Sequence, residues 1–169
     1  MANLTTKYLG LELKSPIIVS SSDLTKNIEN LKKIEEFGAG AVVLKSLFEE
    51  QIKIESRESL TYNNRYGFSY PEAEDYINNY TRQNSLADYI ALIKKAKAEL
   101  TIPVIASVNC VSSTEWVTFA REIEQAGADA LELNIFVLPS DPDRYPEDNE
   151  DVYFDIVNEI KRETNLPIS

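Results

Sequence analysis

Two eight-residue stretches of the chain match each other without a gap, and they constrain the fold more than any other feature. They read GAGAVVLK at residues 38–45 and GADALELN at residues 127–134. Each follows an amphipathic helical pattern, which ends at Phe37 in the first unit and at Ala126 in the second. Each unit therefore predicts a helix, a glycine that stops it and a buried strand. Repeated units of this kind indicate an α/β protein with a parallel sheet under helical cover.

The remaining strands and helices alternate in the same way along the chain. Strands are predicted at residues 16–20, 41–45, 104–108 and 130–134, and a helical pattern of period 3.6 follows each of them. The pattern after the second strand is that of Leu86, Ile90 and Ile93, so a long segment from Leu47 to Gln83 precedes it. Residues 8–13 predict a short β-hairpin before the first unit, placed to cover one end of the sheet.

This order of elements predicts a (β/α)₈ barrel of the TIM-barrel type. A closed barrel takes about 250 residues, whereas this chain has 169 and finishes in Pro167-Ile168-Ser169, which repeats the proline-led strand openings at Pro16 and Pro103. We therefore expect residues 1–169 to form a single domain, the N-terminal half of a barrel, with four βα units and the start of strand 5. An open, doubly wound sheet of four strands is the alternative.

Polar side chains collect where the predicted strands end. Alternation along the strand at 130–134 places Leu131 and Leu133 on one face, and Glu132 and Asn134 on the other. In (β/α)₈ enzymes the active site lies at the carboxyl ends of the strands. Glu132 is predicted to pair with a lysine of the barrel interior rather than to do chemistry. The other polar residues at strand ends are Ser20, Ser22, Lys45, Ser107 and Asn109.

Composition narrows the classes of partner and of chemistry. The net charge of −11 and the pI near 4.5 disfavour nucleic acid and anionic membrane surfaces, which are bound through excess lysine and arginine. No apolar run approaches the roughly 20 residues of a membrane span, and the N-terminus lacks the pattern of a signal peptide, so a cytoplasmic protein with a small-molecule substrate is predicted. With no histidine and one cysteine, Cys110, the chain has no usual transition-metal ligand set.

Three motifs together resemble one known family. They are PIIVSSS at residues 16–22, AGAVVLKS at 39–46 and ADALELN at 128–134. In this order they resemble the dihydroorotate dehydrogenases, which are FMN enzymes on a (β/α)₈ barrel. The resemblance covers essentially the whole chain as the N-terminal half of that family. It implies an FMN-dependent oxidoreductase acting on a CH–CH bond, the oxidation of dihydroorotate to orotate in pyrimidine biosynthesis, and a homodimer for the full-length protein.

The resemblance also assigns roles to individual residues. Ser20, Ser21 and Ser22 match the segment that approaches the flavin. Lys45 matches a lysine that reaches both flavin and substrate, and Ser46 matches its neighbour on the cofactor. Asn134 matches an asparagine that bonds the flavin ring or the substrate. Asn64 and Gly67 match the start of the substrate-binding loop. The family grips the FMN phosphate from strands 7 and 8, beyond Ser169, so this chain alone is expected to bind FMN poorly.

One family position is occupied by a residue that cannot do the family's chemistry. The base that removes a proton from dihydroorotate is a cysteine or serine three residues after the asparagine, and here that position is Val137, or Leu138 if one residue is inserted. Neither side chain accepts a proton. Ser140 and Cys110 are the nearest candidates. Two further hypotheses follow: a re-purposed or catalytically silent flavin barrel, and a barrel lyase without flavin that uses Lys45 as a Schiff-base nucleophile.

Overall fold

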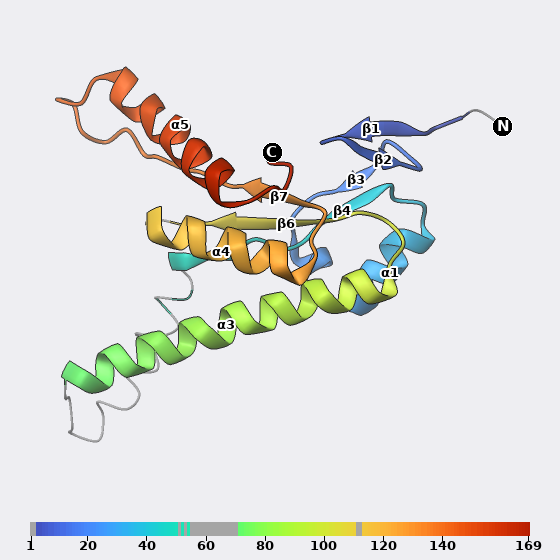
Figure 1. Cartoon of the computed structure of the whole chain (residues 1–169), viewed down its shortest axis with the longest axis horizontal. Helices are drawn as coiled ribbons and strands as arrows, with labels where there is room; N and C mark the ends of the chain where they lie inside the picture. The colour runs from blue at the N-terminus through green and yellow to red at the C-terminus, as the bar shows by residue number, and fades with distance from the viewer. Residues whose placement is uncertain (1–2, 51, 53, 55–70, 111–112) are drawn as a thin grey trace.

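Figure 1 shows the computed structural model of the chain, which describes residues 3–50, 52, 54, 71–110 and 113–169. The strands are β1 (Thr6–Tyr8), β2 (Leu11–Leu13), β3 (Ile18–Val19), β4 (Ala41–Val43), β5 (Leu47–Phe48), β6 (Val104–Asn109) and β7 (Ala130–Leu133). The helices are α1 (Ile28–Glu36), α3 (Pro71–Glu99), α4 (Ser113–Ala126) and α5 (Pro146–Glu163), with a short 3₁₀ helix at Asp23–Thr25.

The larger sheet is parallel, and β3, β4, β6 and β7 lie side by side in the order of the sequence. The end of the chain adds to it beyond β7. Leu131 donates its N–H to the Pro167 carbonyl at 2.9 Å, and Ser169 donates to the Leu131 carbonyl at 3.0 Å. The four predicted strands, their parallel pairing and the beginning of a fifth strand are therefore confirmed.

Helices cover one face of this sheet in the described part of the chain, and we call it the helix face. A doubly wound sheet carries helices on both faces, so the sequential strand order and the single helical layer argue against that alternative. The core on the helix face combines side chains of all four helices with those of three strands: Leu31, Ile93, Phe119, Ile160, Val42, Val104 and Leu131.

The opposite face, which we call the free face, is covered by the hairpin where the strands begin. β1 and β2 pair antiparallel, with Tyr8 opposite Leu11, which confirms the predicted hairpin and extends it back to Thr6. Leu13 is 2% exposed and packs on alternate residues of three strands. Those residues are Ala41, Val43, Ile105 and Ala130. The carboxyl-terminal half of the free face is left to polar side chains.

The helix after the second predicted strand is longer than its apolar pattern indicates. α3 begins at Pro71, well before Leu86, and includes the second part of the segment from Leu47 to Gln83. Proline suits the first position of a helix, where its missing N–H has no partner to lose. The first turns of α3 extend past the sheet (Figure 1). Long as it is, α3 is not apolar enough to cross a membrane, and neither is any other helix that the structure describes.

Candidate functional site

Four side chains from different segments form one hydrogen-bonded chain at the carboxyl ends of the strands, and we call it the hydroxyl chain. Ser107 of β6 donates to Glu132 Oε1 of β7 at 2.8 Å. The Ser107 and Ser46 hydroxyl oxygens lie 2.7 Å apart, and those of Ser46 and Ser21 lie 2.9 Å apart. The Ser46 N–H also donates to Ser21 Oγ at 2.8 Å. The carboxyl-terminal ends of β3, β4, β6 and β7 are thereby linked across the free face.

A β-bulge places Ser46 in this chain. Val43 pairs with Ile105 and Leu47 pairs with Val108, so four steps along one strand match three along the other. One residue between β4 and β5 is therefore extra, which is the definition of a bulge. Strict alternation would put Ser46 on the helix face. The extra residue instead turns Ser46 toward Ser107 on the free face and returns Leu47 to the core of the helix face.

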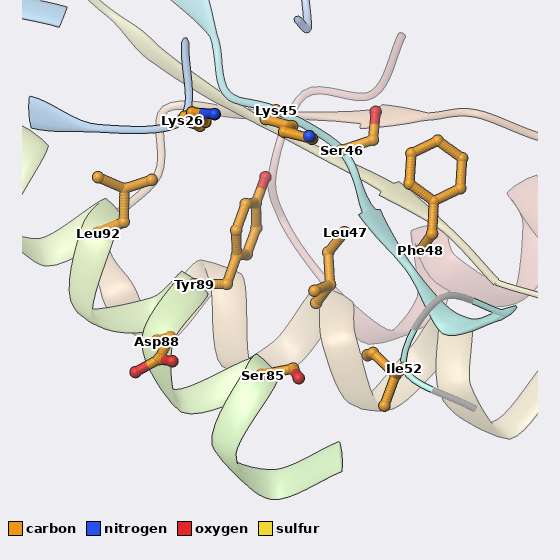
Figure 2. A pocket seen from close by; sticks show the side chains of 10 residues that line it. All are labelled: Lys26, Lys45, Ser46, Leu47, Phe48, Ile52, Ser85, Asp88, Tyr89 and Leu92. Atoms are coloured by element: carbon orange, nitrogen blue, oxygen red, sulfur yellow. The ribbon is translucent and has the colours of Figure 1, made fainter. Parts of the chain in front are cut away.

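The gap that the bulge opens in the strand ladder is filled by Tyr89 of α3. Its hydroxyl donates to the Ser107 carbonyl at 3.0 Å and accepts from the Ser107 N–H at 2.9 Å. In Figure 2 the Tyr89 hydroxyl points away from α3 toward the segment that carries Lys45 and Ser46. Burial, with the negative charge of Glu132 as a smaller contribution, raises the pKa of Tyr89 above its usual value. One phenol group thus replaces both ladder partners of Ser107.

Lys45 stands at the outer edge of the site. Its Nζ lies 2.5 Å from Asp23 Oδ1, and Lys26 Nζ lies 3.6 Å from Asp23 Oδ2. The hydrogen bond from Lys45, assisted by the charge of Lys26, lowers the pKa of the exposed Asp23 carboxyl. Lys45 also lines a cavity of about 270 Å³ between α3 and the bulge, together with Ser46 and Tyr89 (Figure 2).

The other residues that sequence reasoning assigned to a cofactor lie around this centre. Ser22 is the N-cap of the 3₁₀ helix, and its hydroxyl accepts from the Leu24 N–H at 3.3 Å. Ser20 is exposed. Asn134 follows β7, and its carbonyl accepts from Asn109 Nδ2. The structure therefore brings Ser21, Lys45 and Ser46 together, and Asn134 lies at the end of the neighbouring strand pair.

The apolar loop after β7 lies over a second cavity, of about 420 Å³. Val137, in the position of the family base, is half-buried, and its N–H donates to the Tyr153 hydroxyl at 3.3 Å. Ser140 is exposed in the same loop, where its N–H donates to the Leu138 carbonyl. The buried Cys110 lines the cavity with Val137. Its other lining residues are Phe48, Glu50, Asn109, Asn134, Ile135, Phe136, Val152 and Ile156.

Two predictions about the site stay predictions. The substrate-loop residues Asn64 and Gly67 lie outside the described residues. The predicted pairing of Glu132 with a lysine of the barrel interior stays a prediction, because the part of the chain that the structure describes shows no such pair and corresponds to only part of the predicted barrel. There Glu132 accepts from Ser107, and Lys45, which the strand pattern places at the same end of the sheet, pairs with Asp23. The bulge and the 3₁₀ helix bring Lys45 to that carboxylate.

Sequence reasoning missed three participants. Ser107 was recognised as a polar strand end but was given no role, and Tyr89 and Asp23 were not singled out. Alternation gives the face of each side chain, and the observed register of β6 and β7 pairs Ser107 with Glu132. Nothing in the pattern of Leu86, Ile90 and Ile93 signals that Tyr89 reaches the ladder.

Comparison with known proteins gives relatives of one kind, although no family model matches the sequence. Over 99% of its length the chain is 29% identical to the catalytic subunit of dihydroorotate dehydrogenase B (NAD⁺) of Thermoplasma volcanium, and 28% identical to that of Thermoplasma acidophilum. It is 33% identical to the corresponding subunit of Methanocella arvoryzae over 75% of its length. The chain covers 53% of each Thermoplasma protein and 38% of the third, so it spans about half the length of these relatives or less.

Proposed function

Because the chain is a relative of the dihydroorotate dehydrogenases along 99% of its length, as its strand-end motifs predicted, we propose that it forms the N-terminal half of an FMN-dependent (β/α)₈ oxidoreductase. The reaction proposed is removal of two hydrogens from a CH–CH bond of a small cyclic substrate, dihydroorotate in the first instance. The observation that carries the proposal is the grouping of Lys45, Ser46 and Ser21 at the carboxyl ends of sequentially ordered parallel strands. A cytoplasmic homodimer of the full-length protein belongs to the same proposal.

The donor set suits the polar edges of a flavin ring. FMN would supply the hydride acceptor, and the protein's share is to bind and orient it. The Lys45 ammonium can donate to a ring carbonyl, and the exposed Asn134 amide can both donate and accept. The phosphate needs a further grip, which in barrel enzymes comes from strands 7 and 8. We therefore expect this chain alone to hold FMN weakly and the full-length protein to hold it well.

Replacing Lys45 tests the cofactor proposal. In the full-length protein, Lys45→Met is expected to raise the Kd for FMN by roughly 10-fold to 100-fold, because a hydrogen bond from a charged donor contributes about 1.5–3 kcal/mol. Quenching of FMN fluorescence measures the Kd. Lys33→Met, an exposed lysine of α1, is the control and should leave the Kd unchanged. A wild-type protein that purifies colourless and does not bind added FMN would contradict the proposal.

A flavin protein without dihydroorotate chemistry is the second candidate, and Val137 is the observation that favours it. If Val137 occupies the base position, Val137→Cys should install a proton acceptor and speed reduction of the bound flavin by dihydroorotate about 100-fold, the lower end of the range for general-base catalysis. Anaerobic loss of the flavin absorption band measures the rate. Leu138→Cys serves as the comparison, since it is the correct position only if the loop carries an insertion. A wild type that already reduces its flavin rapidly would place the base elsewhere, with Cys110 and Ser140 next to be replaced.

The lyase hypothesis is the weakest of the three. Schiff-base lysines are activated by desolvation or by a neighbouring cation, whereas the Lys45 side chain is 41% exposed and forms an ion pair with Asp23. Trapping with borohydride and a carbonyl substrate, followed by intact mass measurement, would detect such a lysine, and we expect no adduct.

A further inference from the structure

We propose that Glu132 is a positioning residue that, through Ser107, makes the hydroxyls of Ser46 and Ser21 hydrogen-bond acceptors for the ring N–H of the flavin. This inference rests on the proposed function, because it concerns the orientation of groups at the same site. It specifies which group on the polar edge of the flavin these hydroxyls recognise, and it gives Glu132 a role in that recognition.

The direction of each hydrogen bond follows from counting protons. A serine hydroxyl has one proton to donate and two lone pairs that accept. Ser107 gives its proton to Glu132, so the bond between Ser107 and Ser46 must be donated by Ser46. Ser46 has then spent its own proton, and the bond to Ser21 must be donated by Ser21. The hydroxyl chain therefore runs in one direction, from Ser21 to the carboxylate.

The two outer hydroxyls have acceptor capacity left and no proton left to donate. Ser46 accepts one bond, from Ser21. Ser21 accepts one bond, from the Ser46 N–H, and is half-buried at the outer end of the chain. Each keeps one lone pair, so a ligand group that meets these oxygens has to be a donor. Against a ligand carbonyl they would place oxygen against oxygen.

This pattern matches one edge of the oxidised flavin ring. That ring carries a single N–H, and a carbonyl oxygen lies on each side of it. The hydroxyl acceptors of Ser21 and Ser46 suit the N–H, and the ammonium of Lys45 suits a carbonyl. A site with only donors, or only acceptors, would not distinguish this edge from others.

A carboxylate is the group that can fix this direction. An ionised carboxylate accepts only, so Ser107 cannot reverse its bond, whereas an amide at position 132 could present its NH₂ and reverse the whole chain. Hydrogen bonds that end on a charged group are also the stronger ones, and neighbours in a chain polarise one another. The negative charge of Glu132 is felt nearby, since it contributes to the raised pKa of the buried Tyr89.

The test compares FMN with FMN methylated on the ring N–H, using the full-length protein. The wild type is expected to bind FMN at least 10-fold more tightly than the methylated form. In Glu132→Gln this preference should fall to about 3-fold or less, because the hydroxyls can then turn. Glu122→Gln, the same change at an exposed position of α4, should keep the wild-type preference. Ser107→Ala interrupts the hydroxyl chain at a different residue and should lower the preference for FMN as Glu132→Gln does. It therefore tests the inference even if Glu132→Gln folds poorly.

Each contrary result would overturn either this inference alone or the proposed function as well. Equal affinity of the wild type for the two flavins would overturn this inference and leave the proposed function standing. A preference that survives unchanged in both Glu132→Gln and Ser107→Ala would show that methylation is rejected by bulk alone, and would overturn it as well. A full-length protein that binds neither flavin would overturn the proposed function, and this inference with it.

Discussion

Tyr89→Phe is expected to destabilise the protein by about 3 kcal/mol. The change removes one oxygen, but that oxygen is the partner of both the N–H and the carbonyl of Ser107. Each buried backbone group left without a partner costs about 1–3 kcal/mol. Urea unfolding of the wild type and the variant measures the difference in the free energy of unfolding.

Tyr153→Phe is the matched control for this prediction. Its hydroxyl accepts a single bond from Val137 at 3.3 Å on a side chain that is 37% exposed, so its loss should cost about 0.5 kcal/mol. The dependence of stability on pH also distinguishes Tyr89→Phe from Tyr153→Phe. Because the pKa of Tyr89 is raised in the folded state, its contribution is complete below the unfolded pKa near 10 and is lost as the pH rises above it. The stability difference between wild type and Tyr89→Phe should therefore narrow above pH 10. Equal stability of the two variants at neutral pH would contradict the role assigned to Tyr89.

The parts of the fold that the sequence predicted are those that depend on local periodicity. Alternation along β7 predicts Leu131 and Leu133 on one face and Glu132 on the other. In the structure Leu131 and Leu133 pack in the core of the helix face, and Glu132 belongs to the hydroxyl chain. The same rule accounts for Val43 on the free face and Val42 in the core of the helix face. The alternation of helices and strands could be predicted because apolar residues recur with a period of 3.6 in helices and of two in half-buried strands.

The parts that were not predicted depend on a departure from periodicity. The second strand was expected to run straight to Lys45, but it bulges there and resumes as β5. One extra residue leaves no compositional mark, since Val43 through Phe48 would read as a strand with or without it. The bulge then changes what Ser46 and Leu47 contact and leaves a ladder gap that a side chain from another element has to fill. Such a long-range substitution cannot be read from the sequence around Tyr89.

Gly40→Ala is the second change with a large expected effect, and the repeat that opened the sequence shows why. Gly40 and Asp129 occupy the same position in the two units. At Asp129 there is room for a side chain, which accepts from the Val104 N–H and from Lys97, each at 2.7 Å. At Gly40 the segment leading from the hairpin into β3 passes across the same position. A Cβ there would lie 1.9 Å from the Ser15 carbonyl oxygen.

Because that neighbour is backbone, Gly40→Ala can be accommodated only by moving the hairpin connection away from the sheet. The Gly40 N–H donates to the Ile17 carbonyl at 2.8 Å, so the movement would also strain the pairing at the start of β3. We expect a loss of about 3 kcal/mol, at the upper end of overpacking costs, measured by urea unfolding. Gly10→Ala is the control: Gly10 has a positive φ of 78° but nothing within 4 Å of an added Cβ, so conformational strain alone should cost about 1 kcal/mol. If Gly40→Ala were no more destabilising than Gly10→Ala, the hairpin connection would have to be free to shift. In that case the close approach of Ser15 would not be the reason why this unit of the repeat carries glycine where the other carries aspartate.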